Sequence, residues 1–222
     1  MKSITSCVMT MAVLAGMTLA VRAAAPPTVQ VPHTALTIRF YNTSGMPSQN
    51  LLAARLATES ILRDTGLDVV VRHCGRSVAP GEPVDACDEP LKPSELVVRI
   101  IDAPAFNTTL HPDAYGLAYV VPETNRGWLA TVFSDRIDRA AARLGVDTGT
   151  LLGLVAAHEV GHLLLGSTYH AEGGLMRADW TDALLARESQ GWRFSMGEAA
   201  RIHRVLESIA GASIANPAGT TF

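Results

Sequence analysis

The chain has 222 residues, of which 48% are hydrophobic, and this predicts one domain of ordinary size with a single buried core. Its 18 basic and 21 acidic residues give a formal net charge of −3, and the Lys and Arg residues form no cluster. Because nucleic-acid-binding proteins carry a basic patch, this charge distribution excludes that class of partner.

The N-terminus has the pattern of a secretory signal peptide. Lys2 precedes an apolar run from Cys7 to Val21, and small residues at Ala23 and Ala25 then offer a cleavage site. The run is shorter than the roughly 20 residues that a membrane span needs, which disfavours the alternative of an uncleaved anchor. We therefore expect residues 1–25 to be removed and the mature protein to be secreted or periplasmic, without stable membrane association.

The first elements of the mature chain follow a proline-rich stretch. Residues 26–34 predict a linker that leads into a domain over residues 35–215. Apolar and polar residues alternate over residues 35–42, which predicts a β-strand. Residues 44–66 then show the periodicity of an amphipathic helix, and Gly66 marks its end.

Two β-branched runs, residues 67–74 and 94–101, predict the second and third strands. They flank a loop rich in Pro, Gly and Asp that joins Cys74 to Cys87. An even pair of cysteines in an exported chain predicts a disulfide, with two unpaired thiols as the alternative. Closing this loop would stabilise the fold by about 3 kcal/mol in the chain-entropy description.

The next four elements are two strands and two helices. Residues 116–121 and 127–134 are separated by turn-forming residues and predict an antiparallel pair. A short helix over residues 135–145 follows. A long apolar helix then covers about residues 150–165, with Asp147 or Thr148 as its cap.

The last helix covers residues 195–211 and begins with a Ser195-x-x-Glu198 capping box. Residues 216–222 form a tail. Taken in order, these elements predict an α+β fold in which a mixed sheet packs on the two long helices.

The long apolar helix carries the sequence His-Glu-x-x-His at residues 158–162. Residues four apart project from the same side of a helix, so His158 and His162 can direct two imidazoles at one metal ion. Glu159 lies about 100° further round the helix axis and can reach a water on that metal. The alternative, a core helix whose histidines bond backbone carbonyls, leaves Glu159 buried without a partner.

The stretch "HEVGHLLLGSTYH", followed by "GGLM", resembles the metzincin class of zinc endopeptidases. The residues that carry the resemblance are His158, Glu159, His162, Gly166, His170 and Met176. The stretches "AHEVGHLLLGS" and "LMRADW" also resemble a set of secreted bacterial proteins that are predicted to be metalloproteases. The similarity to that set extends over most of the mature chain.

The resemblance implies a zincin-like fold in which a mixed twisted sheet packs on a backing helix and an active-site helix, with a C-terminal helix. It also implies a Zn²⁺ cofactor, a peptide or protein substrate, and a turn that places Met176 beneath the metal. Substrate would lie extended beside an edge strand, for which residues 128–134 are the candidate.

The third zinc ligand departs from the metzincin pattern H-E-x-x-H-x-x-G-x-x-H. Gly166 lies one place later and His170 two places later. The extra residue before Gly166 lengthens the helix by about 1.5 Å, and a left-handed cap at Gly can still turn the chain back toward the metal. We therefore predict His170 as the third ligand, because imidazole suits zinc. The carboxylates that remain as alternatives are Glu172, Asp179, Glu188 and Glu198.

These residues together predict an exported zinc endopeptidase that hydrolyses peptide bonds with zinc-activated water and Glu159 as general base. One alternative is a non-catalytic exported protein that binds zinc and keeps a zincin fold. Another is a zinc hydrolase of non-peptide amides. Glu159 argues against the non-catalytic reading, since a purely structural zinc site needs no base.

Overall fold

A computed structural model describes residues 35–75, 87–103, 114–185 and 192–215. These residues belong to one unit of the chain, which begins at His33. The predicted signal peptide, the linker and the C-terminal tail lie outside the described residues, as does Glu188.

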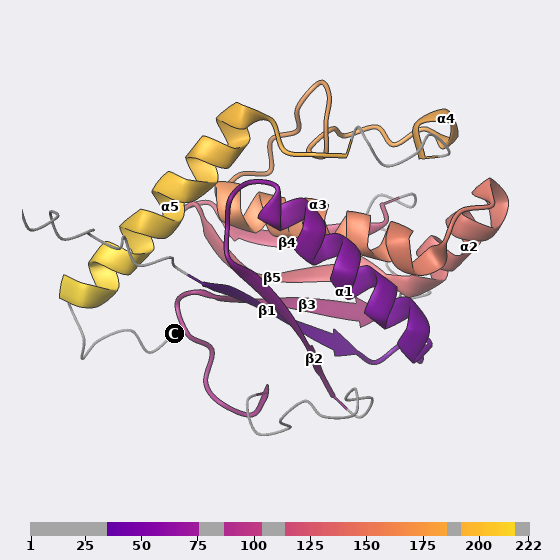
Figure 1. Cartoon of the computed structure of the whole chain (residues 1–222), viewed down its shortest axis with the longest axis horizontal. Coiled ribbons are helices and arrows are strands. Elements are labelled where there is room, and N and C mark those ends of the chain that lie inside the picture. The colour runs from indigo at the N-terminus through magenta and orange to yellow at the C-terminus, as the bar shows by residue number, and fades with distance from the viewer. Residues whose placement is uncertain (1–34, 76–86, 104–113, 186–191, 216–222) are drawn as a thin grey trace, which may run out of the picture. The chain divides into compact units, whose positions relative to one another are not determined.

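A five-stranded sheet with the order β2-β1-β3-β5-β4 forms the base of this unit (Figure 1). Its strands are β1 (Leu36–Asn42), β2 (Val69–Cys74), β3 (Glu95–Ile101), β4 (Gly116–Val121) and β5 (Arg126–Phe133). Strands β1, β2, β3 and β5 run parallel to one another, whereas β4 pairs antiparallel with β5. The mixed sheet and the antiparallel pair are therefore confirmed.

The prediction of which strand lies at the edge of the sheet is wrong. Residues 128–134 fall largely within β5, which lies inside the sheet because β3 pairs with one side of it and β4 with the other. The edge of the sheet at that end is β4. Both strands show similar local patterns, so the sequence offered no sign of which one has an unpaired side.

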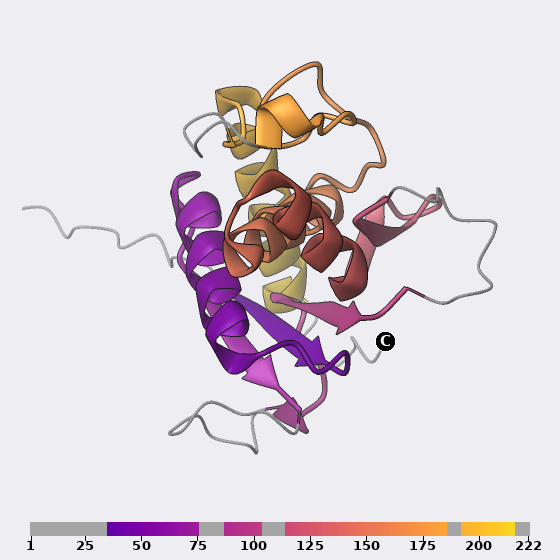
Figure 2. The same ribbon diagram turned by 90° about the vertical axis from the view of Figure 1, so that its right-hand side faces the viewer.

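The helices are α1 (Ser48–Arg63), α2 (Ser134–Leu144), α3 (Thr148–Leu165), α4 (Asp182–Leu185) and α5 (Met196–Ala215). Helices α1 and α3 pack against each other and lie on the same face of the sheet, as Figures 1 and 2 show. Each long helix was predicted to within a few residues, and the α+β class is confirmed. The single turn α4 was not predicted, because four residues are too few to show a helical period.

The core lies between the sheet and these two helices. Its fully buried side chains include Leu62 on α1, Leu152 and Val160 on α3, and Val98 and Val132 on the strands. Burying side chains of this size contributes about 1.5–3 kcal/mol each relative to leaving them in water. This layer fixes the position of α3.

Helix α3 is long and apolar enough to meet the length and composition criteria for a membrane span, yet 89% of it is buried inside the protein. Asp147 caps its first turn by accepting a hydrogen bond from the Thr150 backbone N–H at 2.6 Å. Gly166 ends it in the left-handed conformation, at φ 59°. The helix is therefore a core helix with the two ends that its sequence predicts.

Two further predictions concern the edges of the fold, and both are confirmed. Cys74 and Cys87 form a disulfide. At the start of α5, the Ser195 backbone N–H donates to the Glu198 carboxylate at 2.7 Å, and the Glu198 N–H donates to the Ser195 hydroxyl at 3.2 Å. Further along α5, Arg201 donates to the carbonyl of Leu165, which ties this helix to the C-terminal end of α3.

Candidate metal centre and active site

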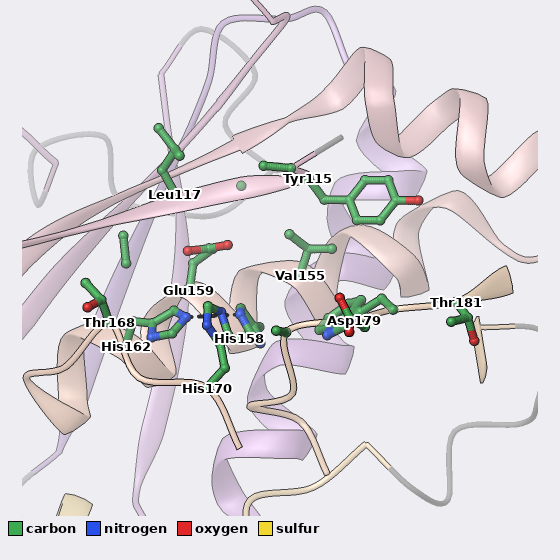
Figure 3. A pocket seen from close by; sticks show the side chains of 15 residues that line it. Tyr115, Leu117, Val155, His158, Glu159, His162, Thr168, His170, Asp179 and Thr181 are labelled. Atoms are coloured by element: carbon green, nitrogen blue, oxygen red, sulfur yellow. Dashed lines mark hydrogen bonds between the residues drawn. The ribbon is translucent and has the colours of Figure 1, made fainter. Parts of the chain in front are cut away.

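The centre of the candidate site is a pair of imidazoles one turn apart on α3. His158 and His162 are both buried, and their Nε2 atoms lie 3.1 Å apart. The two rings meet edge to face at a centroid distance of 4.7 Å, and both are among the residues that line a pocket (Figure 3). The spacing of four residues thus produces the convergence that the motif predicts.

Backbone carbonyls determine which nitrogen of each ring carries the proton. The Nδ1 atom of His158 lies 2.7 Å from the carbonyl oxygen of Leu175, and that of His162 lies 2.8 Å from the carbonyl oxygen of Ser167. A carbonyl can only accept a hydrogen bond, so both Nδ1 atoms must be the donors. Both Nε2 atoms of the neutral rings therefore present lone pairs toward each other.

Burial keeps these two rings neutral. It lowers the pKa of His158 to about 3, against the weaker opposing effect of the hydrogen bond with Leu175, and it also lowers the pKa of His162. Two lone pairs 3.1 Å apart with no proton between them repel unless a cation lies beside them. Nitrogens that share one tetrahedral zinc lie about 3.3 Å apart, so the pair fits that ion.

His170 approaches this pair from the loop after α3. Its ring stacks on that of His158 at a centroid distance of 5.4 Å and meets that of His162 edge to face at 4.7 Å. One nitrogen from each of the three rings lies within 4.8 Å of the other two. The structure therefore brings together the three predicted zinc ligands, of which His170 is exposed.

The loop that carries His170 is short and tied back on itself. After the left-handed Gly166, the Tyr169 N–H donates to the Ser167 hydroxyl at 3.1 Å. The Ala171 N–H then donates to the carbonyl of Met176 at 2.7 Å. These bonds return the chain over α3. Of the two extra residues relative to the metzincin spacing, one lies within α3, which ends at Leu165, and the other lies in the loop between Gly166 and His170.

The rival carboxylate ligands are placed differently. Asp179 lines the same pocket, and Glu172 is exposed. Glu198 serves the capping box of α5. Within the part of the chain that the structure describes, the one group of three side chains with metal-binding spacing is His158, His162 and His170.

Met176 is almost fully buried. Its sulfur packs against Gly161 on α3, where an added Cβ would lie only 2.5 Å from it. The preceding residue, Leu175, holds the His158 ring through its carbonyl. The role of Met176 as the floor of a metal site remains a prediction that this packing accommodates.

Trp180 packs on a candidate ligand. Its ring meets that of His158 edge to face at 5.1 Å, and its indole N–H donates to the carbonyl of Arg177 at 2.9 Å. Trp192 packs behind it at 4.8 Å. The orientation of the His158 ring is thus restrained by an aromatic ring as well as by a hydrogen bond.

Glu159 follows His158 on α3 and lines the same pocket as the three imidazoles. Figure 3 shows its carboxyl directed toward the strand that carries Leu117. Burial raises the pKa of Glu159 to about 8. Among the described residues, no hydrogen bond or ion pair fixes this carboxyl. It is a buried, unpaired acid beside a candidate metal site, which is the environment of a general base.

A pocket of about 950 Å³ connects these groups. Its walls come from β4 and the residues before it, from α3, from the loop at His170 and from the segment before α4. The lining residues that sequence reasoning did not select as site residues include Gly116, Leu117, Ala118, Val155, Thr168 and Thr181. A glycine in a strand often marks a place where another group comes close to the backbone. Of these six lining residues, Gly116 was therefore the one for which the sequence held a signal.

No protein-family model matches this sequence, and a search of curated proteins finds no match. Among solved structures, the chain is similar to a zinc-dependent peptidase from Methanocorpusculum labreanum, with 15% identity and a TM-score of 0.46, over 74% of this chain and 99% of that one. It is also similar to an archaemetzincin from Methanopyrus kandleri, with 16% identity and a TM-score of 0.46, over 79% and 98% of the two chains. Similarity at this level does not carry an activity over to this chain.

Proposed function

We propose that the protein is an exported zinc-dependent endopeptidase. The observation that carries the proposal is the pair of imidazole lone pairs that converge at 3.1 Å beside a buried, unpaired carboxyl. Both features are costly in a protein core and both are satisfied by a bound cation and its water. A pocket open to solvent lies over them.

Three residues would hold the metal: His158 and His162 from α3, and His170 from the loop. Zinc in a site with three imidazole ligands lowers the pKa of its water to about 7 and polarises a carbonyl oxygen. The hydrogen bonds from Nδ1 of His158 and His162 to backbone carbonyls orient these rings for binding through Nε2.

Glu159 would act as the general base and then as the general acid. Its carboxylate accepts a proton from the attacking water and passes that proton to the nitrogen of the leaving amine. In the chain without metal, burial raises the pKa of Glu159 to about 8, which moves it toward the range in which a carboxyl group can serve both as base and as acid.

The substrate would be an extended peptide that adds to the outer edge of β4, which pairs with no other strand among the described residues. This strand borders the pocket, since Gly116, Leu117 and Ala118 line it. An extended peptide that pairs with β4 is held by main-chain hydrogen bonds along its length. Such pairing suits an internal segment of a polypeptide better than a free terminus, and this favours an endopeptidase.

Export is supported by two features of the chain. The N-terminal segment has the pattern of a signal peptide, and Cys74 and Cys87 form a disulfide of the kind that persists in oxidising compartments. Expression of the full chain in a secreting host should yield a product outside the cytoplasm that lacks residues 1–25. An intact N-terminus on a cytoplasmic product would contradict export.

Two other functions use the same centre. A non-catalytic zinc-binding protein would not need Glu159 or an open pocket. A hydrolase of non-peptide amides would use both, but the free edge of β4 favours a peptide. Zinc-loaded protein incubated with a mixed peptide library, with and without chelator, tests the proposal against both alternatives: chelator-sensitive cleavage at internal bonds supports the proposal, and an uncut library contradicts it.

A further inference from the structure

We propose that Gly116 is a positioning residue for Glu159: its lack of a side chain lets the edge strand β4 lie directly against the carboxyl that acts as base. The functional part of this inference rests on the proposed peptidase activity. The contact between Gly116 and Glu159 does not depend on that activity.

The space at Gly116 is already occupied by its neighbours. A Cβ built there would lie 2.8 Å from both Cγ and Oε1 of Glu159, and 2.9 Å from the backbone carbonyl of Thr131. Real Cβ atoms essentially never approach other heavy atoms within 3.0 Å. Any side chain at this position must therefore displace Glu159 or part of the sheet.

The strand is less free to move than the side chain. Gly116 pairs with Val132 on β5, and the Phe133 N–H donates to the carbonyl of Tyr115 at 2.9 Å. Strand β5 is in turn held by β3 on its far side. Moving β4 outward breaks backbone hydrogen bonds, so we expect an added methyl group to push the Glu159 carboxyl instead.

Glu159 depends on such packing for its position. Among the described residues, no donor hydrogen-bonds to its carboxyl, and helix α3 fixes only the start of the side chain. The wall that Gly116 forms therefore sets where the carboxyl group lies relative to the three imidazoles and the strand edge. A substituent on that wall would misplace the base while leaving the ligands untouched.

Backbone conformation does not explain this glycine. The glycines with positive φ among the described residues are at positions 45, 66, 75, 145, 166 and 174, and Gly116 is not one of them. Its backbone is therefore one that any residue can adopt. The requirement is for space, and this makes the inference testable with the smallest possible side chain.

The first test is the Gly116→Ala variant of the full zinc-loaded protein. We expect a zinc content equal to that of the wild type, KM within about threefold, and kcat lower by about a hundredfold, the loss typical of a displacement of about 1 Å in a reacting group. Gly197→Ala is the matched control, because the nearest atom to a Cβ at Gly197 lies 4.0 Å away. Wild-type kcat in G116A would overturn the proposal.

The second test measures the contact without any activity. The drop in melting temperature caused by G116A is compared in the wild-type and Glu159→Ala backgrounds, both without metal. If the methyl group collides with Glu159, the drop should be smaller by about twofold or more in E159A, the remainder arising from the Thr131 carbonyl. Equal drops in both backgrounds would overturn the proposal.

The two tests separate this inference from the proposed function. If the wild type cleaves no peptide, the endopeptidase proposal fails, while the melting-temperature cycle still decides whether Gly116 positions Glu159. If the wild type cleaves peptides and the cycle shows no coupling, the endopeptidase proposal stands and this inference fails.

Discussion

The candidate metal site is built from two regions that differ in how firmly the fold holds them. His158 and His162 lie on α3 and are 7% and 5% exposed, with core side chains around the helix. His170 lies in a loop, is exposed, and depends on a few backbone hydrogen bonds near the Ala171–Met176 contact. The helix half is thus formed before metal binds, whereas the loop half has more conformational entropy to lose on binding.

The largest expected effect comes from a change in the helix half that should slow peptide hydrolysis and leave zinc binding intact. The Glu159→Gln variant keeps the size and shape of the side chain but cannot accept a proton. We expect zinc affinity within a few-fold of the wild type and peptide hydrolysis slower by about 10²–10⁴-fold. Turnover by zinc-loaded protein against a peptide cleaved by the wild type measures this. Full activity in E159Q would show that Glu159 is not the base.

Removal of a zinc ligand on α3 tests the helix half directly. In His158→Ala, one of the two converging nitrogens is lost. Loss of a residue that only hydrogen-bonds to a metal ligand lowers metal affinity by roughly 10–100-fold, and we expect the loss of the ligand itself to lower zinc affinity by more than that. Competition with a chromophoric chelator gives the value. His203→Gln is the control, because His203 bonds the carbonyl of Thr65 and lies outside the candidate pocket.

Removal of the loop ligand sharpens the comparison. In His170→Ala, the preformed pair on α3 remains, so we expect a smaller loss of zinc affinity than in H158A, about 10–100-fold. The same chelator competition measures it. Unchanged affinity in H170A would remove His170 from the ligand set and return attention to Asp179, which lines the same pocket.

The smallest expected effect is on the stability of chelator-treated protein. Burial raises the pKa of Glu159 to about 8 from an ordinary value of 4.5, so the folded chain keeps a proton that the unfolded chain loses between these values. This contribution to stability is complete below pH 4.5 and is lost as the pH rises toward 8. It is on the order of a few kcal/mol at most.

Urea unfolding at pH 5 and pH 8.5 measures this loss, with E159Q as the control because it cannot titrate. The wild type should lose more stability than E159Q between the two pH values. The lowered pKa of His158 acts below pH 6.5 in both proteins and therefore cancels in the difference. Parallel pH dependence in the two proteins would show that Glu159 is not buried as the structure has it.

The helix half and the loop half also differ in how well the sequence predicted them. The helix half follows from local pattern: a period of 3.6 residues, Asp147 and Gly166 at the two ends, and two histidines one turn apart. His170 could be predicted only as a candidate, since its spacing departs from the metzincin pattern and the path of a loop is not local information. The hydrogen bonds that return the loop over α3 are visible only in the fold.

Strand order was the main failure. Residues 116–121 and 127–134 were predicted as a pair, but which of them borders β3 depends on contacts between distant segments. The partnership of Gly116 with Glu159 is of the same kind, because it joins β4 to α3, and two elements, β5 and α2, lie between them in the chain. Local sequence shows an isolated glycine in a strand and does not show what approaches it.

The central claim is that the two halves together hold one zinc ion through three imidazoles and leave one position open beside Glu159. X-ray absorption spectroscopy of zinc-loaded protein tests it directly. We predict one zinc per chain, coordinated by three imidazole nitrogens and one ligand that does not come from the protein. Four protein ligands around the zinc, or the absence of stoichiometric binding, would contradict the account.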